Sequence, residues 1–120
     1  MIFIANILVA IVAALHVYFL VLEMFLWTKP LGLKTFRNSI EKATESAVLA
    51  ANQGLYNGFL AAGLLWGLIY PNAAAGAHVQ MFFLGCVIMA GIYGGLTVKR
   101  TILYVQAGPA LLGLLALLAA

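Results

Sequence analysis

Four long runs of hydrophobic residues divide the chain, and short polar segments separate them. The runs cover roughly residues 4–27, 47–70, 79–98 and 101–119. Each is close to the ~20 residues that an α-helix needs to cross the hydrocarbon core of a bilayer. A backbone in lipid must satisfy its polar groups internally, and the alternating segments of a membrane barrel are absent. The pattern therefore predicts an all-α protein, a four-transmembrane-helix bundle that forms a single domain over residues 1–120.

The first connection, residues 28–46, is long and contains helical periodicity of its own. Pro30 and Gly32 are expected to break the chain after the first run, and Phe36 and Ile40 begin an apolar repeat at helical spacing. The second helix is therefore predicted to start near Thr35 and to extend into the cytoplasm before it enters lipid.

Two prolines shape the rest of the chain. Pro71 opens a short second connection, predicted over residues 71–78, which carries no Lys or Arg. Pro109 lies inside the fourth run, where its ring removes a backbone donor and frees the carbonyl of Val105, so a kink is expected there.

Composition and charge favour a membrane protein over a soluble one. Of the 120 residues, 66% are hydrophobic and only 8% are charged, which leaves too little polar surface for a soluble domain. All six basic residues lie in residues 28–46 and 99–100, so the positive-inside rule predicts that both segments are cytoplasmic. Both termini and residues 71–78 are then periplasmic. The net charge of +3 thus reports topology, with membrane lipid and not nucleic acid as the partner.

Glycines four residues apart recur on the second and third predicted helices. Such pairs lie on one helix face and allow two backbones to approach closely. Packing within the chain and a homo-oligomer interface both remain open as interpretations. The glycines concerned are Gly54, Gly58, Gly91 and Gly95.

The functional question rests on polar side chains within the predicted spans. His16 and Glu23 are seven residues apart in the first run and fall on nearly one helix face. Ionisable groups inside a membrane are costly and usually functional. The second run carries several amides, expected to face inward because lipid is a poor environment for them. We predict a pocket for a small molecule, lipid or proton, open to the cytoplasm or the inner leaflet. Its candidate residues are His16, Glu23, Asn52, Gln53, Tyr56, Asn57, Tyr93, Thr97, Tyr104 and Gln106.

Several kinds of chemistry lack their sequence signatures. Cys86 is the single cysteine and is interpreted as a small buried hydrophobe. His16 and His78 are predicted at different depths, and no His-x3-His or Glu-x2-His pair exists, so no metal site is expected. A phosphate loop, a dinucleotide fingerprint and a Ser-His-acid set are also missing, which leaves the cofactor unassigned.

Two blocks of residues carry a family resemblance. They are Leu22-Glu23-Met24-Phe25-Leu26-Trp27, preceded by Leu15-His16-x-Tyr18, and the more specific block Asn-Gln-Gly-Leu-Tyr-Asn-Gly-Phe-Leu-Ala over residues 52–61. With them the chain resembles a family of small bacterial four-helix integral membrane proteins of unknown function. The resemblance implies a fold class and a location in the bacterial inner (plasma) membrane, and it names no reaction.

A second resemblance is architectural. The pattern Arg37-Asn38-x-x-Glu41, with Arg100 and Tyr104, is similar to part of the polar pattern of the membrane-associated eicosanoid and glutathione metabolism family. That likeness implies a trimer with glutathione held between protomers on the cytoplasmic side.

The sequence thus leaves three functions open. The first is a membrane protein whose polar interior binds a small molecule, lipid or proton. The second is a glutathione- or lipid-handling trimeric enzyme. The third is a small transporter coupled to protons or cations, in which Glu23 binds the ion.

Overall fold

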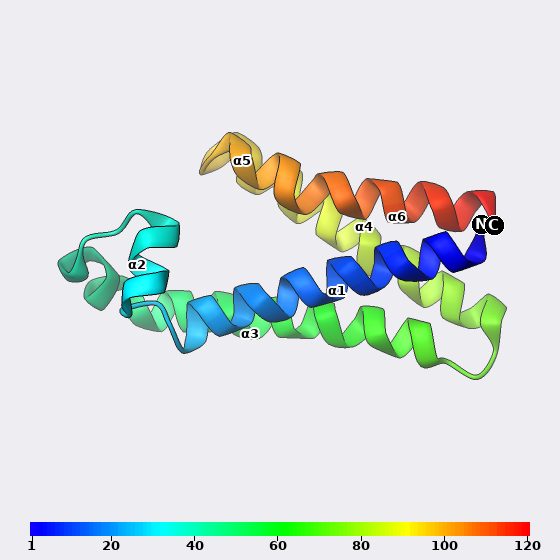
Figure 1. Cartoon of the computed structure of the whole chain (residues 1–120), viewed down its shortest axis with the longest axis horizontal. Helices are drawn as coiled ribbons and strands as arrows, with labels where there is room; N and C mark the ends of the chain where they lie inside the picture. Colours follow the sequence, from blue (N-terminus) through cyan, green and yellow to red (C-terminus); the bar gives the residue numbers. More distant parts are fainter. The chain divides into compact units, whose positions relative to one another are not determined.

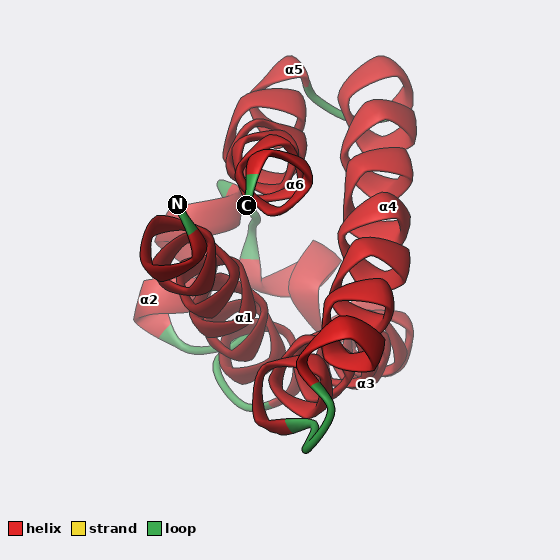
Figure 2. Cartoon of the chain, turned by 90° about the vertical axis from the view of Figure 1, so that its right-hand side faces the viewer, coloured by secondary structure: helices red, strands yellow, loops and turns green.

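The computed structural model describes all of residues 1–120, and every regular element in it is a helix (Figure 2). Its elements are α1 (Ile2–Met24), α2 (Pro30–Phe36), α3 (Ile40–Ile69), α4 (Ala73–Thr97), α5 (Arg100–Ile102), the π-helix η1 (Leu103–Ala107) and α6 (Gly108–Ala119) (Figure 1). The prediction of an all-α protein is confirmed.

Three helical stretches are long and apolar enough to cross a membrane. They are α1, α4 and the continuous stretch Arg100–Ala119 that joins α5, η1 and α6. The longest helix, α3 with 30 residues, is not among them. Its middle carries Asn52, Gln53 and Asn57, and these amides offset the apolar residues around them. Three of the four predicted spans are thus helices long and apolar enough to cross a membrane, and α3, the fourth, does not meet that criterion.

The chain divides into two compact units. Unit 1 comprises Met1–Ala14 and Leu60–Ala120, and unit 2 comprises Leu15–Phe59. Both α1 and α3 contribute residues to each unit. The prediction of a single domain stays a prediction.

Unit 1 is built around one apolar core to which four helices contribute. The buried side chains are mostly small, which allows the helices to approach closely in surroundings where apolar burial alone gives little gain. Its members are Ala5, Val9, Val12 and Ala13 of α1, Leu64 of α3, Leu84 and Val87 of α4, and Ala110, Ala116 and Leu117 of α6.

The glycine pairs of the sequence contact helices of the same chain. A Cβ atom on Gly91 would lie 2.6 Å from the backbone nitrogen of Ala107, and one on Gly95 would lie 2.6 Å from the Cβ of Leu103. In unit 2, Gly54 and Gly58 likewise pack against α1. Of the two interpretations, these contacts favour packing within the chain.

We expect Gly91→Ala to destabilise unit 1. The added Cβ meets the backbone of Ala107, which cannot rotate away, and overpacking of this kind costs about 1–3 kcal/mol. Gly85 of α4 is the matched control, because a Cβ there meets no atom within 4 Å. Gly85→Ala is expected to be neutral or to stabilise by up to about 1 kcal/mol through helix propensity. Thermal unfolding in detergent micelles measures both, and equal effects of the two substitutions would contradict the packing.

Two predicted helix starts are wrong. The segment 30–36 forms the separate helix α2, with Pro30 in its first turn, so α3 begins at Ile40 and not near Thr35. Proline suits a first helical turn, where its missing N–H has no partner to lose. The third long helix begins at Ala73 and not near residue 79, because Asn72 caps it by accepting a hydrogen bond from the amide of Ala75 at 2.9 Å.

The irregularity expected near Pro109 takes the form of a π-helix. Over Leu103–Ala107 the backbone hydrogen bonds join residues five positions apart, whereas those of an α-helix join residues four positions apart. The amide of Gly108, for example, donates to the carbonyl of Leu103. Proline cannot donate to the carbonyl of Val105, so this stretch lacks one bond of the regular α pattern. Insertion of a π turn is one of the known ways in which a helix absorbs such a loss.

Candidate functional site

A hydrogen bond between α1 and α3 lies at the centre of unit 2. The side-chain amide Nδ2 of Asn57 donates to Oε1 of Glu23. Both side chains are half-buried, and Oε2 of Glu23 makes no hydrogen bond within the chain. Asn57 and Glu23 are thus two of the ten candidate residues that the structure brings into direct contact.

Two glycines bring these helices close enough for the bond to form. A Cβ atom on Gly54 would lie 2.6 Å from Cγ of Met24, 3.1 Å from Cβ of Glu23 and 3.2 Å from the carbonyl oxygen of Leu20. A Cβ on Gly58 would lie 2.7 Å from Cδ1 of Leu20. Asn57 follows Gly54 by three residues on α3 and therefore lies on the same side of the helix. The carboxyl group thus meets an amide donor and no cationic side chain.

A second polar contact in unit 2 involves Trp27, just after the end of α1. The indole Nε1 of Trp27 donates to Oγ of Ser46 at 3.1 Å, and the Ser46 hydroxyl donates to the carbonyl of Lys42 at 2.7 Å. The Trp27 ring also packs on Phe36 of α2, with 4.8 Å between the ring centroids. These contacts hold α2 and the start of α3 against the residues that follow α1.

His16 is fully buried, at 0% exposure. Its ring contacts Phe19 edge-on, with 5.3 Å between the ring centroids and an interplanar angle of 70°. Glu23 lies seven residues further along α1, which corresponds to about 10 Å along the helix axis. His16 and Glu23 therefore lie at different depths.

Three polar residues of α3 that were expected to face inward are exposed. They are Asn52, Gln53 and Tyr56. The buried face of α3 in unit 2 is marked by Ala43, Ala50 and Gly54, and Asn52 lies on nearly the opposite side of the helix. The three side chains make no hydrogen bond within the chain. Their part in a binding site stays a prediction.

The four remaining candidates belong to unit 1 and do not converge. Tyr93 and Thr97 of α4 are exposed, and the Thr97 hydroxyl donates to the carbonyl of Tyr93 at 2.7 Å. Tyr104 of η1 is exposed, and Gln106 is half-buried.

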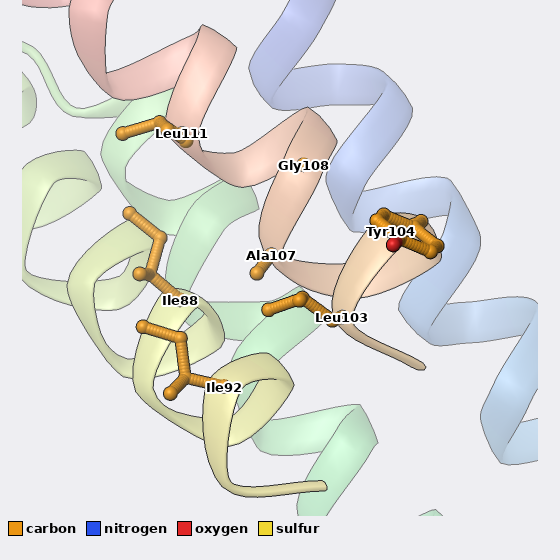
Figure 3. Close-up of a pocket in the computed structure, with 7 residues that line it drawn as sticks. All are labelled: Ile88, Ile92, Leu103, Tyr104, Ala107, Gly108 and Leu111. Atoms are coloured by element: carbon orange, nitrogen blue, oxygen red, sulfur yellow. The ribbon is translucent and has the colours of Figure 1, made fainter. Parts of the chain in front are cut away.

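A shallow apolar groove of about 320 Å³ follows η1 and the facing side of α4. Figure 3 shows Ile88 and Ile92 of α4 opposite Leu103 and Ala107, with the ring of Tyr104 directed away from the two isoleucines. The lining is almost entirely hydrocarbon, which suits an acyl chain.

The residues that suggested a glutathione-handling enzyme belong to several separate elements. Arg37 is the C-cap of α2 and Asn38 lies between the helices, so the pattern that begins at Arg37 is not carried on one helix as was expected. Glu41 is in the first turn of α3, while Arg100 and Tyr104 belong to the other unit. No group of three or more His, Cys, Asp or Glu side chains converges as metal ligands do.

Gln80 is a buried polar residue that the sequence analysis missed. Its Nε2 donates to the carbonyl of Gly67 at 3.0 Å, and its Oε1 has no partner. In a continued helix that carbonyl would accept from residue 71, which is proline and has no N–H. Gln80 thus supplies the donor missing from the end of α3. The sequence signal was the pairing of Pro71 with Gln80, the single amide in the next apolar run.

Taken together, these features define a small all-helical protein with three helices long and apolar enough to cross a membrane and a carboxyl–amide contact between α1 and α3. Residues 10–118 match the family described as "Protein of unknown function (DUF1304)", and the chain belongs to this family. It is 30% identical over 115 residues to the uncharacterized protein YpaA of Lactococcus lactis subsp. lactis (strain IL1403), an alignment that covers 93% of this chain and 95% of the relative. No solved structure matches. The predicted membership of an uncharacterised bacterial family is confirmed.

Proposed function

We propose that this protein is a four-crossing protein of the bacterial inner membrane that binds and transfers protons through Glu23. The observation that carries the proposal is the Glu23 carboxyl group, which lies in an apolar helix and is bonded to Asn57 across a helix contact. Ionisable residues within membrane helices mark ion and proton pathways, and Glu and His are the residues from which proton relays are built.

The position of the chain ends supports four crossings. Both termini belong to unit 1 and lie side by side at one end of it (Figures 1 and 2). A chain whose ends lie on the same side of a membrane crosses it an even number of times. With α1, α4 and the stretch Arg100–Ala119 as the three candidate crossings, an even number requires one more, and we assign it to α3.

The length of α3 agrees with a helix that both crosses and projects. Its 30 residues extend about 45 Å, whereas the hydrocarbon core is about 30 Å thick. The surplus lies at its first turns, which carry Glu41, Lys42 and Glu45, and the positive-inside rule assigns this end to the cytoplasm. Glu23 is then near the cytoplasmic end of its span, with His16 deeper on the same helix.

A proton suits the Glu23 site better than a metal cation does. Ions such as Ca²⁺ require six to eight oxygen ligands, as a rule, and Mg²⁺ requires near-octahedral geometry. The contact offers the two carboxyl oxygens of Glu23 and the amide oxygen of Asn57. One unpaired oxygen, Oε2, is sufficient for a proton.

Proton flux into proteoliposomes tests this function. We expect the purified protein to collapse an imposed pH gradient, measured with an entrapped pH-sensitive dye, and Glu23→Gln to reduce the rate to that of empty vesicles. Glu45→Gln is the matched control, because Glu45 is an exposed carboxylate at the cytoplasmic end of α3. Equal flux for the wild-type protein and Glu23→Gln, or no flux above empty vesicles, would refute the proposal.

A further inference from the structure

Three basic side chains bracket the short helix α2. Lys29 is its N-cap residue, Lys34 lies in its last turn and Arg37 is its C-cap residue. All three are exposed, and none forms an ion pair. Because α2 has seven residues and a length of about 10 Å, the three cations are attached to one small surface just beyond the end of α1.

The packing of α2 determines which of its sides is free. A Cβ atom on Gly32 would lie 1.9 Å from the carbonyl oxygen of Leu26, so the Gly32 side of α2 rests on the chain that follows α1. Phe36, four residues later on the same side, packs on Trp27. The opposite side carries Leu31 and Lys34, which are neighbours at a spacing of three residues. Leu31 is 47% exposed, so an apolar side chain and a cation point outward together.

Arg37 adds an independent observation, its backbone conformation. It is the one non-glycine residue with a positive φ, at 53°, in the left-handed region. Its amide donates to the carbonyls of Leu33 and Lys34, as in the usual termination of a helix, where glycine or asparagine is the favoured residue. A β-carbon in this conformation carries a steric cost that glycine avoids. For stability alone, glycine would be the better residue at position 37, so the arginine side chain has a role other than stabilising the fold.

We propose that Lys29, Lys34 and Arg37, together with Leu31, form a binding site for an anionic phospholipid of the inner leaflet. The three cations complement the lipid phosphate, and basic residues just cytoplasmic of a span are attracted to anionic lipid. Leu31 selects a lipid over a soluble anion, because an exposed leucine gains free energy only at the acyl boundary. Of the three acids in the chain, Glu23 is bonded to Asn57, and Glu41 and Glu45 are exposed on α3 and pair with none of the cations. This site is separate from the proton function and requires no part of it.

Native mass spectrometry of the full chain released from nanodiscs tests the site. The nanodiscs contain phosphatidylcholine alone or phosphatidylcholine mixed with phosphatidylglycerol. We expect the wild-type protein to retain phosphatidylglycerol in preference. Each cation near an anionic surface accounts for about a fivefold change in affinity, so Arg37→Gly should weaken retention about fivefold. The same substitution removes the strained β-carbon and should raise the thermal stability, so loss of lipid cannot be ascribed to misfolding.

Two controls separate this site from net charge and from free phosphate. Arg100→Gln removes one positive charge that does not belong to the site and should weaken retention much less than Arg37→Gly does, whereas Arg37→Lys should preserve most of it. Glycerol phosphate added to the detergent-solubilised protein should not displace the lipid. The proposal is overturned if phosphatidylglycerol shows no preference, if Arg37→Gly and Arg100→Gln act equally, or if glycerol phosphate competes fully.

Discussion

Replacing Asn57 by leucine is expected to destabilise the contact between α1 and α3, even though leucine is the more apolar residue. The amide of Asn57 is the hydrogen-bond donor to Oε1 of Glu23, and the carboxyl group is half-buried against Gly54. Without its donor, a carboxyl group in these surroundings loses a partner that water cannot fully replace. The loss of a partner for a buried polar group costs about 1–3 kcal/mol. Thermal unfolding of Asn57→Leu in micelles measures the effect.

The double variant Glu23→Leu/Asn57→Leu separates lost pairing from lost packing. When both partners become apolar no polar group is left unsatisfied, so the double variant should be more stable than Asn57→Leu alone. Asn52→Leu is the matched control on α3, because Asn52 is an exposed amide without a hydrogen-bond partner. It should be neutral or stabilising. An Asn57→Leu variant as stable as the wild-type protein would show that the pair contributes nothing to the contact.

Helix type could be predicted from hydrophobic runs, as could three apolar segments long enough to cross a membrane, while the ends of the helices depended on local contacts. A run of 20 apolar residues predicts a helix whatever surrounds it. The start of α4 was missed because the alanine-rich residues after Asn72 are compatible with a short loop as well as with a helix. The N-cap hydrogen bond of Asn72 is what makes them the first turns of α4. The separate helix α2 was missed because Pro30 is compatible both with a break in the chain and with the first turn of a helix.

For the candidate site, the sequence singled out His16 and Glu23 of α1 but did not show which side of α3 packs against α1. Glu23 is conspicuous because it is the one acid in an apolar run. The second helix offers Asn52, Gln53 and Asn57 within six positions, and composition cannot rank them. The structure ranks them through Gly54 and Gly58, which fix the side of α3 that faces α1 and leave Asn57 beside Glu23. Glycine spacing read together with amide position would have selected Asn57.

Substitution of Gly32 by alanine is expected to detach α2 from the end of α1. The new Cβ atom would lie 1.9 Å from the carbonyl oxygen of Leu26 and 3.1 Å from Cα of Trp27, and both are backbone atoms. Overpacking against backbone costs about 1–3 kcal/mol, occasionally more, and a helix of seven residues has few other contacts with which to resist it. Alanine is a better helix former than glycine, so helix propensity alone predicts the opposite sign.

The environment of Trp27 reports the detachment directly. Trp27 packs on Phe36 and donates to Ser46, so its fluorescence should shift to longer wavelength and become more accessible to a soluble quencher when α2 separates. Trp66 is the other tryptophan and is replaced by phenylalanine in the background used. Gly108→Ala is the control, because a Cβ there meets no atom within 4 Å. If Gly32→Ala leaves the emission of Trp27 unchanged, α2 does not rest on the Leu26 carbonyl, and the outward side assigned to Leu31 and Lys34 is wrong as well.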